Sequence, residues 1–256
     1  MFKRVLAAVS VLLLAVSGCG GVGDGASSGT RGGETLTVFA AASLTEVFTE
    51  LGKAFEGAHP GVRVRFNFAG SSTLARQITQ GAPVDVFAAA SPATMATVTD
   101  AGDAAGQPRV FTRNRLVIAV PKDDPGAVES AGDLSKAGLK VVLCAVQVPC
   151  GAAAEKALDA AGVEVEPVSR EQDVKAVLTK VGIGEADAGI VYRTDAQAAG
   201  DKVKGIGFPE VAQALNDYPI VEVAEAPHPA LAKEFIQLVV GAQGRAALSR
   251  AGFEVP

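Results

Sequence analysis

Tryptophan is absent from the 256-residue sequence, and histidine, tyrosine and methionine occur only twice each. Both histidines, His59 and His228, directly precede prolines in segments predicted to be loops, where surface or turn roles are expected. No serine stands in a G-x-S-x-G motif, and no histidine, cysteine and aspartate residues have the spacing of metal ligands. A hydrolase would also need a base beside a nucleophilic serine. We therefore predict that the protein is not an enzyme and needs no cofactor.

Clusters of basic residues are missing as well. The formal net charge at pH 7 is −5, and it becomes −7 if Lys3 and Arg4 are removed with the N-terminal segment described below. Nucleic-acid binding requires clustered lysine and arginine to neutralise phosphates, so we expect no nucleic-acid partner. An acidic surface also gives no long-range attraction for an anion. An anion site would therefore have to be built from local dipoles.

No apolar run near the N-terminus is long enough to span a membrane. Lys3 and Arg4 precede an apolar run of 12 residues, 5–16, whereas a spanning helix needs about 20. The run suits a secretory signal, and Val16-Ser17-Gly18-Cys19 at its end resembles the lipobox of bacterial lipoproteins. This resemblance implies that residues 1–18 are a signal peptide and that Cys19 is acylated, anchoring an extracytoplasmic protein to the membrane by lipid alone. The alternative is an ordinary signal peptide with a chance cysteine.

Residues 19–33 are rich in glycine and serine and have no apolar face, so we predict a flexible tether. Cleavage before Cys19 would leave 256 − 18 = 238 residues, enough for one large domain or two lobes. The remaining cysteines, Cys144 and Cys150, form an even pair outside the cytoplasm, which favours a disulfide. That bond requires Cα atoms within about 7 Å. The alternative is two small buried thiols.

From residue 34 onward, short apolar strands alternate with amphipathic helices, which predicts an α/β fold. The third strand, residues 85–89, is short and, after Asp85, apolar, as strands covered on both faces tend to be. The predicted strands are residues 36–40, 62–68, 85–89, 116–120, 139–146, 189–192 and 218–223. The predicted helices are residues 44–55, 73–80, 92–101, 152–161, 174–181, 231–240 and 244–250.

At four places a strand ends, a short polar or Gly/Pro loop follows, and a helix begins. These loops hold Ser43, Ser71, Cys150 and Val174. A helix N-terminus has unpaired backbone N–H groups and a partial positive charge, so it can hold an anion without a basic side chain. Each end carries about half a charge, so four ends directed at one point would offset about two negative charges. The arrangement suits a tetrahedral dianion such as molybdate or sulfate.

Several segments resemble the molybdate-binding proteins of bacterial ABC transporters. They are residues 39–44 (FAAASL), 70–78 (GSSTLARQI), 81–87 (GAPVDVF), 172–174 (QDV) and 189–196 (GIVYRTDA), and the resemblance runs from about residue 35 to 253. It implies a two-lobed type II periplasmic binding protein fold, in which each lobe is a mixed sheet flanked by helices and the ligand lies in the interlobe cleft. Lobe 1 would comprise residues 34–116 and 220–256, and lobe 2 residues 117–219. The resemblance also implies a monomer that delivers molybdate or tungstate to a permease and ATPase complex.

The resemblance further implies five ligand contacts. Ser43 and Ser71 would each offer a hydroxyl and a backbone N–H, Cys150 and Val174 a backbone N–H, and Tyr192 its phenolic O–H. Cys150 departs from the small residue usual at its position, and a bond to Cys144 would turn its sulfur away from the ligand. We expect a site of donors only, without a carboxylate, in which metal enters only as the molybdenum of the oxyanion. Such a site disfavours phosphate, which near neutral pH still carries a proton that needs an acceptor.

Each site residue also has a purely structural interpretation. Ser43 with Glu46 forms a capping-box pattern, and Ser71 could cap a helix or shape a turn. Val174 would be a core residue, and Tyr192 a half-buried strand aromatic needing one partner for its hydroxyl. The functional alternatives are a binding protein for another oxyanion, such as sulfate, or an oxyanion sensor domain, which would need a regulatory module.

Overall fold

The computed structural model describes residues 33–255. The predicted signal peptide, Cys19 and residues 20–32 of the predicted tether lie outside the described residues. Within residues 33–255, no helix has the length and apolar character needed to cross a membrane.

The first sheet contains five strands in the order β2-β1-β3-β10-β4. β1 pairs in parallel with β2 and β3, whereas β10 runs antiparallel to both β3 and β4, so the sheet is mixed. The strands are β1 (Glu34–Ala41), β2 (Val62–Ala69), β3 (Val86–Ala88), β4 (Arg109–Asn114) and β10 (Asn216–Glu222).

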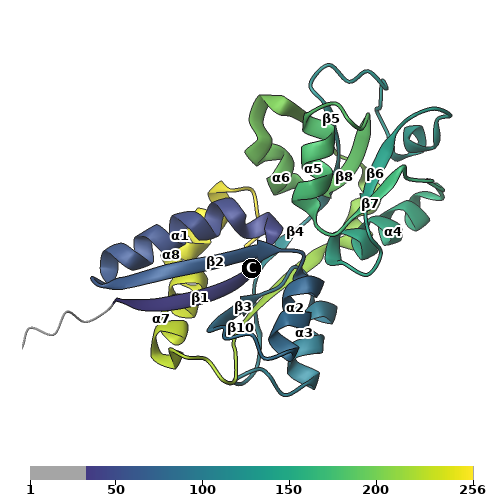
Figure 1. Cartoon of the computed structure of the whole chain (residues 1–256). Helices are drawn as coiled ribbons and strands as arrows, with labels where there is room; N and C mark the ends of the chain where they lie inside the picture. The colour runs from purple at the N-terminus through teal and green to yellow at the C-terminus, as the bar shows by residue number, and fades with distance from the viewer. Residues whose placement is uncertain (1–32, 256) are drawn as a thin grey trace, which may run out of the picture. The chain divides into compact units, whose positions relative to one another are not determined.

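Alternating side chains of β1 face two helical layers, as the period of two in a strand requires. Leu36, Val38 and Ala40 pack into one core with α1 (Thr45–Ala58), α7 (Pro229–Val240) and α8 (Ala242–Arg250). Phe39 packs into a second core with α2 (Ser71–Thr79) and α3 (Pro92–Asp100). Figure 1 shows α2 and α3 side by side beside β3 and β10.

The second sheet also has five strands, in the order β7-β6-β8-β5-β9, and is mixed in the same way. The helix α5 packs so closely on β8 that a Cβ at Gly189 would lie 2.7 Å from Val177 Cγ1. The strands are β5 (Leu116–Pro121), β6 (Val141–Cys144), β7 (Ser169–Glu171), β8 (Ala188–Tyr192) and β9 (Val203–Ile206). The helices are α4 (Pro149–Ala161), α5 (Val174–Gly182) and α6 (Arg193–Ala199).

Short 3-10 turns complete the described chain. They are η1 (Ala42–Leu44), η2 (Ala131–Ser135), η3 (Gly200–Lys202) and η4 (Pro209–Ala214). Of these turns, η1 matters for the site, because it contains Ser43 and continues directly into α1.

The two-sheet α/β fold predicted from the sequence is confirmed. The chain passes from the first sheet to the second at Arg115, between β4 and β5, and returns at Leu215, just before β10. The predicted lobe boundaries, 116/117 and 219/220, fall slightly later. Leu116 pairs within the second sheet and residues 216–219 within the first, because β5 and β10 each keep their hydrogen bonds in one sheet along their whole length.

Candidate binding site

The five residues singled out in the sequence line one small pocket. It has a volume of about 20 Å³ and is lined by loops that follow strands of both sheets. Each of the five residues is at most 4% exposed. The described residues that line the pocket are Ala41, Ala42, Ser43, Ala69, Gly70, Ser71, Ala90, Val148, Pro149, Cys150, Asp173, Val174 and Tyr192.

Four helices begin at this pocket. Ser43 lies within η1, which continues as α1, and Ser71 is the first residue of α2. Cys150 is the second residue of α4, and Val174 is the first of α5. The first N–H groups of a helix have no partner inside the helix, and each N-terminus carries about half a positive charge. The pocket therefore offers backbone donors and a positive potential without a cationic side chain.

The two serine hydroxyls do not cap their helices. Ser43 Oγ lies 2.9 Å from the hydroxyl oxygen of Tyr218, and the residue at the N-cap of α1 is Leu44. Ser71 Oγ accepts a hydrogen bond of 3.0 Å from the backbone N–H of Ala90, and Gly70 occupies the N-cap of α2. The capping interpretations of both serines are therefore wrong.

Tyr192 ends β8 and is 1% exposed. Its hydroxyl oxygen accepts a hydrogen bond of 3.1 Å from the side-chain amide of Asn216. Burial raises the pKa of the phenol well above its ordinary value, so the hydroxyl keeps its hydrogen and can donate it. Val174 buries its side chain among core residues, and its backbone N–H opens α5.

Cys144 and Cys150 are joined by a disulfide, with their Cα atoms 5.8 Å apart. The bond connects the end of β6 to the first turn of α4 and directs the Cys150 sulfur to Cys144. The chain turns so tightly that a Cβ at Gly151 would lie 1.9 Å from the carbonyl oxygen of Ala145. The loop before α4 is therefore held from both ends.

The expectation that no carboxylate belongs to the site needs correction. Asp173 lines the pocket, but its Oδ1 accepts a hydrogen bond of 3.0 Å from the backbone N–H of Ala176 as the N-cap of α5. An aspartate is a favoured N-cap because its oxygen pairs with an otherwise free donor. Among the described lining residues there is no lysine or arginine.

A group of charged residues beside the pocket was not found from the sequence. Lys175, directly after Val174, lies 2.7 Å from Glu46 Oε1 on α1 and 3.0 Å from Asp195 Oδ1 on α6. Asp195 is fully buried, and neither of its carboxylate oxygens accepts a hydrogen bond of good geometry. The two carboxylates neutralise the lysine, so the group adds no net positive charge next to the pocket. The local sequence gave no sign of it, because 129 residues separate Lys175 from Glu46.

Residues of the two sheets touch around the pocket. Ser72 Oγ donates a hydrogen bond of 2.8 Å to the carbonyl of Gln147. A Cβ at Gly70 would lie 2.2 Å from the carbonyl oxygen of Gln172, so this approach is possible only without a side chain. Contacts of this kind bury the pocket-lining hydroxyls.

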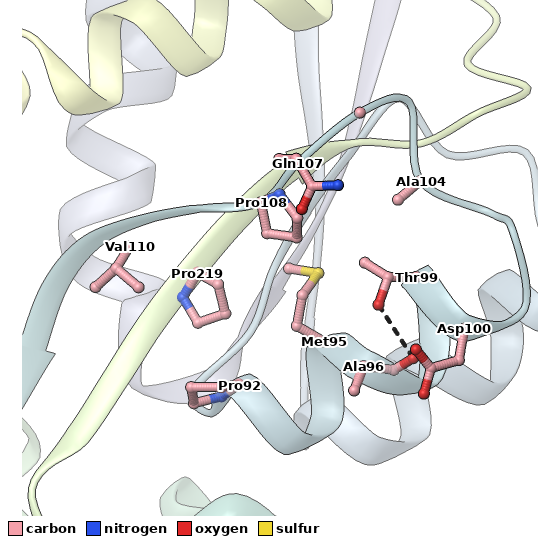
Figure 2. Close-up of a pocket in the computed structure, with 11 residues that line it drawn as sticks. Pro92, Met95, Ala96, Thr99, Asp100, Ala104, Gln107, Pro108, Val110 and Pro219 are labelled. Carbon is pink, nitrogen blue, oxygen red and sulfur yellow. Dashed lines mark hydrogen bonds between the residues drawn. The ribbon is translucent and has the colours of Figure 1, made fainter.

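A larger hollow on the first lobe, of about 680 Å³, lies away from these helix starts. Figure 2 shows Met95 of α3 pointing toward Pro108, with Pro219 beside it. The charged side chain that lines this hollow is Asp100. An acidic group disfavours an anion there, so the small pocket remains the candidate site.

Replacing Asp195 with asparagine is expected to change how stability depends on pH. Burial raises the pKa of Asp195 to about 6, although Lys175 offsets part of the effect, whereas an unfolded aspartate titrates near about 3.9. At a pH between these two pKa values, the Asp195 carboxyl is protonated in the folded protein but ionised in the unfolded chain. This group therefore stabilises the wild type below pH 4 and loses that contribution, about 3 kcal/mol, as the pH rises through 6.

The test is urea unfolding of the wild type and Asp195→Asn at several pH values from 4 to 7. The free energy of unfolding of the variant relative to wild type should increase across this range, whereas the exposed control Asp159→Asn should show no such increase. A difference between Asp195→Asn and wild type that does not vary with pH would contradict the raised pKa.

The protein has two α/β lobes joined by two chain crossings, and four helices begin at one buried pocket. This architecture defines a two-lobed binding protein. The chain belongs to the family of bacterial extracellular solute-binding proteins, whose family model matches residues 36–254.

Comparison with individual proteins confirms the resemblance seen in the sequence. The molybdate-binding protein ModA of Mycobacterium tuberculosis is 44% identical over 251 residues, which cover 97% of this chain and 96% of that protein. A relative from Bacillus subtilis described as a substrate-binding lipoprotein of an ABC transporter is 30% identical and covers 99% of both chains. The periplasmic molybdate-binding protein of Azotobacter vinelandii has the same fold, with a TM-score of 0.75 at 23% identity over 86% of this chain and 99% of that chain.

Proposed function

We propose that this protein captures molybdate, and also tungstate, outside the cytoplasm and delivers it to the permease and ATPase of an ABC importer. It performs no chemistry on the anion, which is cargo rather than cofactor. The observation that carries the proposal is the meeting of Ser43, Ser71, Cys150, Val174 and Tyr192 at one buried pocket without a lysine or arginine in its lining. The names of the relatives given above support the choice of molybdate.

The number and type of donors suit a dianion. Two serines and one tyrosine supply hydroxyl hydrogens, and the first turns of four helices supply backbone N–H groups. Hydrogen bonds from such donors to an ionised acceptor are stronger than neutral ones. A fully deprotonated tetrahedral anion can accept from every one of these groups. The proton of hydrogen phosphate needs an acceptor, and the carboxylate that lines the pocket, Asp173, already accepts through Oδ1 from the backbone N–H of Ala176.

The proposal extends to how the protein is held at the membrane. The signal-like residues 1–18 and Cys19 would yield a lipoprotein whose binding lobes stand in water as a monomer. The relative described as a lipoprotein supports this arrangement. Mass spectrometry of the membrane fraction should find the mature N-terminus at Cys19 carrying acyl chains, and a soluble product with an unmodified cysteine would contradict it.

Calorimetric titration of the purified protein with four anions tests the function. Molybdate and tungstate are expected to bind tightly, sulfate much more weakly, and phosphate hardly at all. A preference for phosphate, for a sugar or for an amino acid would refute the proposal. Strong sulfate binding with weak molybdate binding would assign the protein to sulfate instead.

A further inference from the structure

The three hydroxyls at the pocket are held from behind by other polar groups. A hydroxyl has one hydrogen and can accept through its oxygen. When a protein group already donates to that oxygen, the hydrogen is left for a different acceptor. The direction of each hydrogen bond behind the pocket therefore determines what the pocket can offer a ligand.

For Ser71 the direction is unambiguous. The backbone N–H of Ala90 can only donate, and it donates to Ser71 Oγ over 3.0 Å. The Ser71 hydrogen is thus directed elsewhere, and the residue lines the pocket.

For Tyr192 the direction follows from Asn216, the first residue of β10. Asn216 Nδ2 donates to the carbonyl of Ala90 over 2.7 Å, and a carbonyl can only accept. This contact fixes the orientation of the amide, so the same nitrogen also donates to the Tyr192 hydroxyl oxygen at 3.1 Å. The Tyr192 hydrogen then points away from Asn216, toward a ligand or toward the neighbouring Tyr218 hydroxyl. The peptide groups of Ala90 and the side chain of Asn216 thus connect two of the site hydroxyls.

For Ser43 the partner is Tyr218, two residues further along β10. The two hydroxyl oxygens are 2.9 Å apart, and either could donate. Burial raises the pKa of Tyr218 well above its ordinary value, so its hydroxyl keeps its hydrogen. Tyr192 and Asn114 are further hydrogen-bonding neighbours of the Tyr218 hydroxyl. The contact therefore holds Ser43 Oγ in place without fixing which of the two hydroxyls donates.

We infer that Asn216 is a positioning residue that keeps the Tyr192 hydroxyl as a donor, and that it contributes to the discrimination against anions that carry a proton. This inference rests on the proposed function. Asn216 does not line the pocket. By donating to the Tyr192 oxygen, it weakens that oxygen as an acceptor for the proton of a hydrogen phosphate ion, so β10 affects selectivity without contacting the anion.

The test uses Asn216→Leu, which removes the donor to Tyr192. Thr112→Val is the matched control, because Thr112 is a fully buried residue of the same lobe whose hydroxyl bonds to the carbonyl of Glu254 and to no site residue. Thermal melting establishes that each variant is folded. Displacement calorimetry at pH 7 then gives the affinities for molybdate, sulfate and phosphate.

In Asn216→Leu the preference for molybdate over phosphate should fall by about tenfold, because the freed Tyr192 oxygen can accept the phosphate proton. The preference for molybdate over sulfate should stay within about threefold, because neither anion carries a proton. The control should change neither ratio. A folded variant with an unchanged phosphate ratio, or with equal changes in both ratios, would overturn the inference. If the wild type bound none of the deprotonated anions, the proposed function itself would fail.

Discussion

Gly70→Ala is expected to weaken molybdate binding roughly 5- to 150-fold, because the new methyl group would collide with the opposite lobe. A Cβ at this position would lie 2.2 Å from the carbonyl oxygen of Gln172. Overpacking of this kind costs about 1–3 kcal/mol, which corresponds to that loss of affinity if the lobes must touch here when the anion is bound.

The fold itself should tolerate the change. Gly70 has φ −58° and ψ 128°, a conformation open to alanine, and the collision is with a residue that moves away if the lobes separate. Loss of a glycine at the N-cap costs no more than about 1 kcal/mol of stability. Calorimetric titration and urea unfolding of the variant would therefore separate an effect on binding from an effect on folding.

Gly57→Ala is the matched control. Gly57 lies in α1, and an added Cβ would meet nothing within 4 Å, so affinity should be unchanged and stability should rise by up to about 1 kcal/mol. If Gly70→Ala bound molybdate as tightly as wild type, the contact between Gly70 and Gln172 would not belong to the bound state.

Ser43→Ala and Ser71→Ala are each expected to lower the affinity for molybdate about 10- to 150-fold. Each removes one hydrogen bond to a charged ligand, worth about 1.5–3 kcal/mol. The variants should remain folded, although each removes a hydrogen-bond partner from one buried polar group: the hydroxyl of Tyr218 in the first and the N–H of Ala90 in the second. Such a group costs about 1–3 kcal/mol of stability.

The control for the serine variants is Ser249→Ala, an exposed serine of α8 far from the pocket lining. It should match wild type in calorimetric titration and thermal melting. Unchanged affinity in both Ser43→Ala and Ser71→Ala would place the anion elsewhere in the protein.

The fold was predictable where strands are apolar on both faces. The runs that became β1, β3, β5 and β8 are buried almost throughout, so hydrophobicity alone revealed them. The strands β4, β7 and β9 were missed because they are short or carry alternating charges, such as Arg109 and Arg113 in β4. Helix α6 was missed because its seven residues are too few for a clear apolar period.

The residues that line the pocket were predictable from the sequence, whereas the residues that contact their hydroxyls from behind were not. Ser43, Ser71, Cys150 and Val174 each follow a strand and begin a helix, which is a local pattern that a sequence displays. Tyr218 and Asn216 contribute through contacts with residues far away in the chain, at separations of 175 residues for Ser43–Tyr218 and 24 for Tyr192–Asn216. Only the pairing of β10 with β3 and β4 brings them behind the pocket, and no local pattern indicates that pairing.

The most direct test of the account is a crystal structure of the protein with molybdate bound. The account predicts the anion in the small pocket, with its oxygens at hydrogen-bond distance from the hydroxyls of Ser43, Ser71 and Tyr192 and from the backbone N–H groups of Cys150 and Val174. No lysine or arginine should touch it. Density for the anion against a cluster of basic side chains, or away from these helix starts, would contradict the claim that uncharged donors alone hold a doubly negative ion.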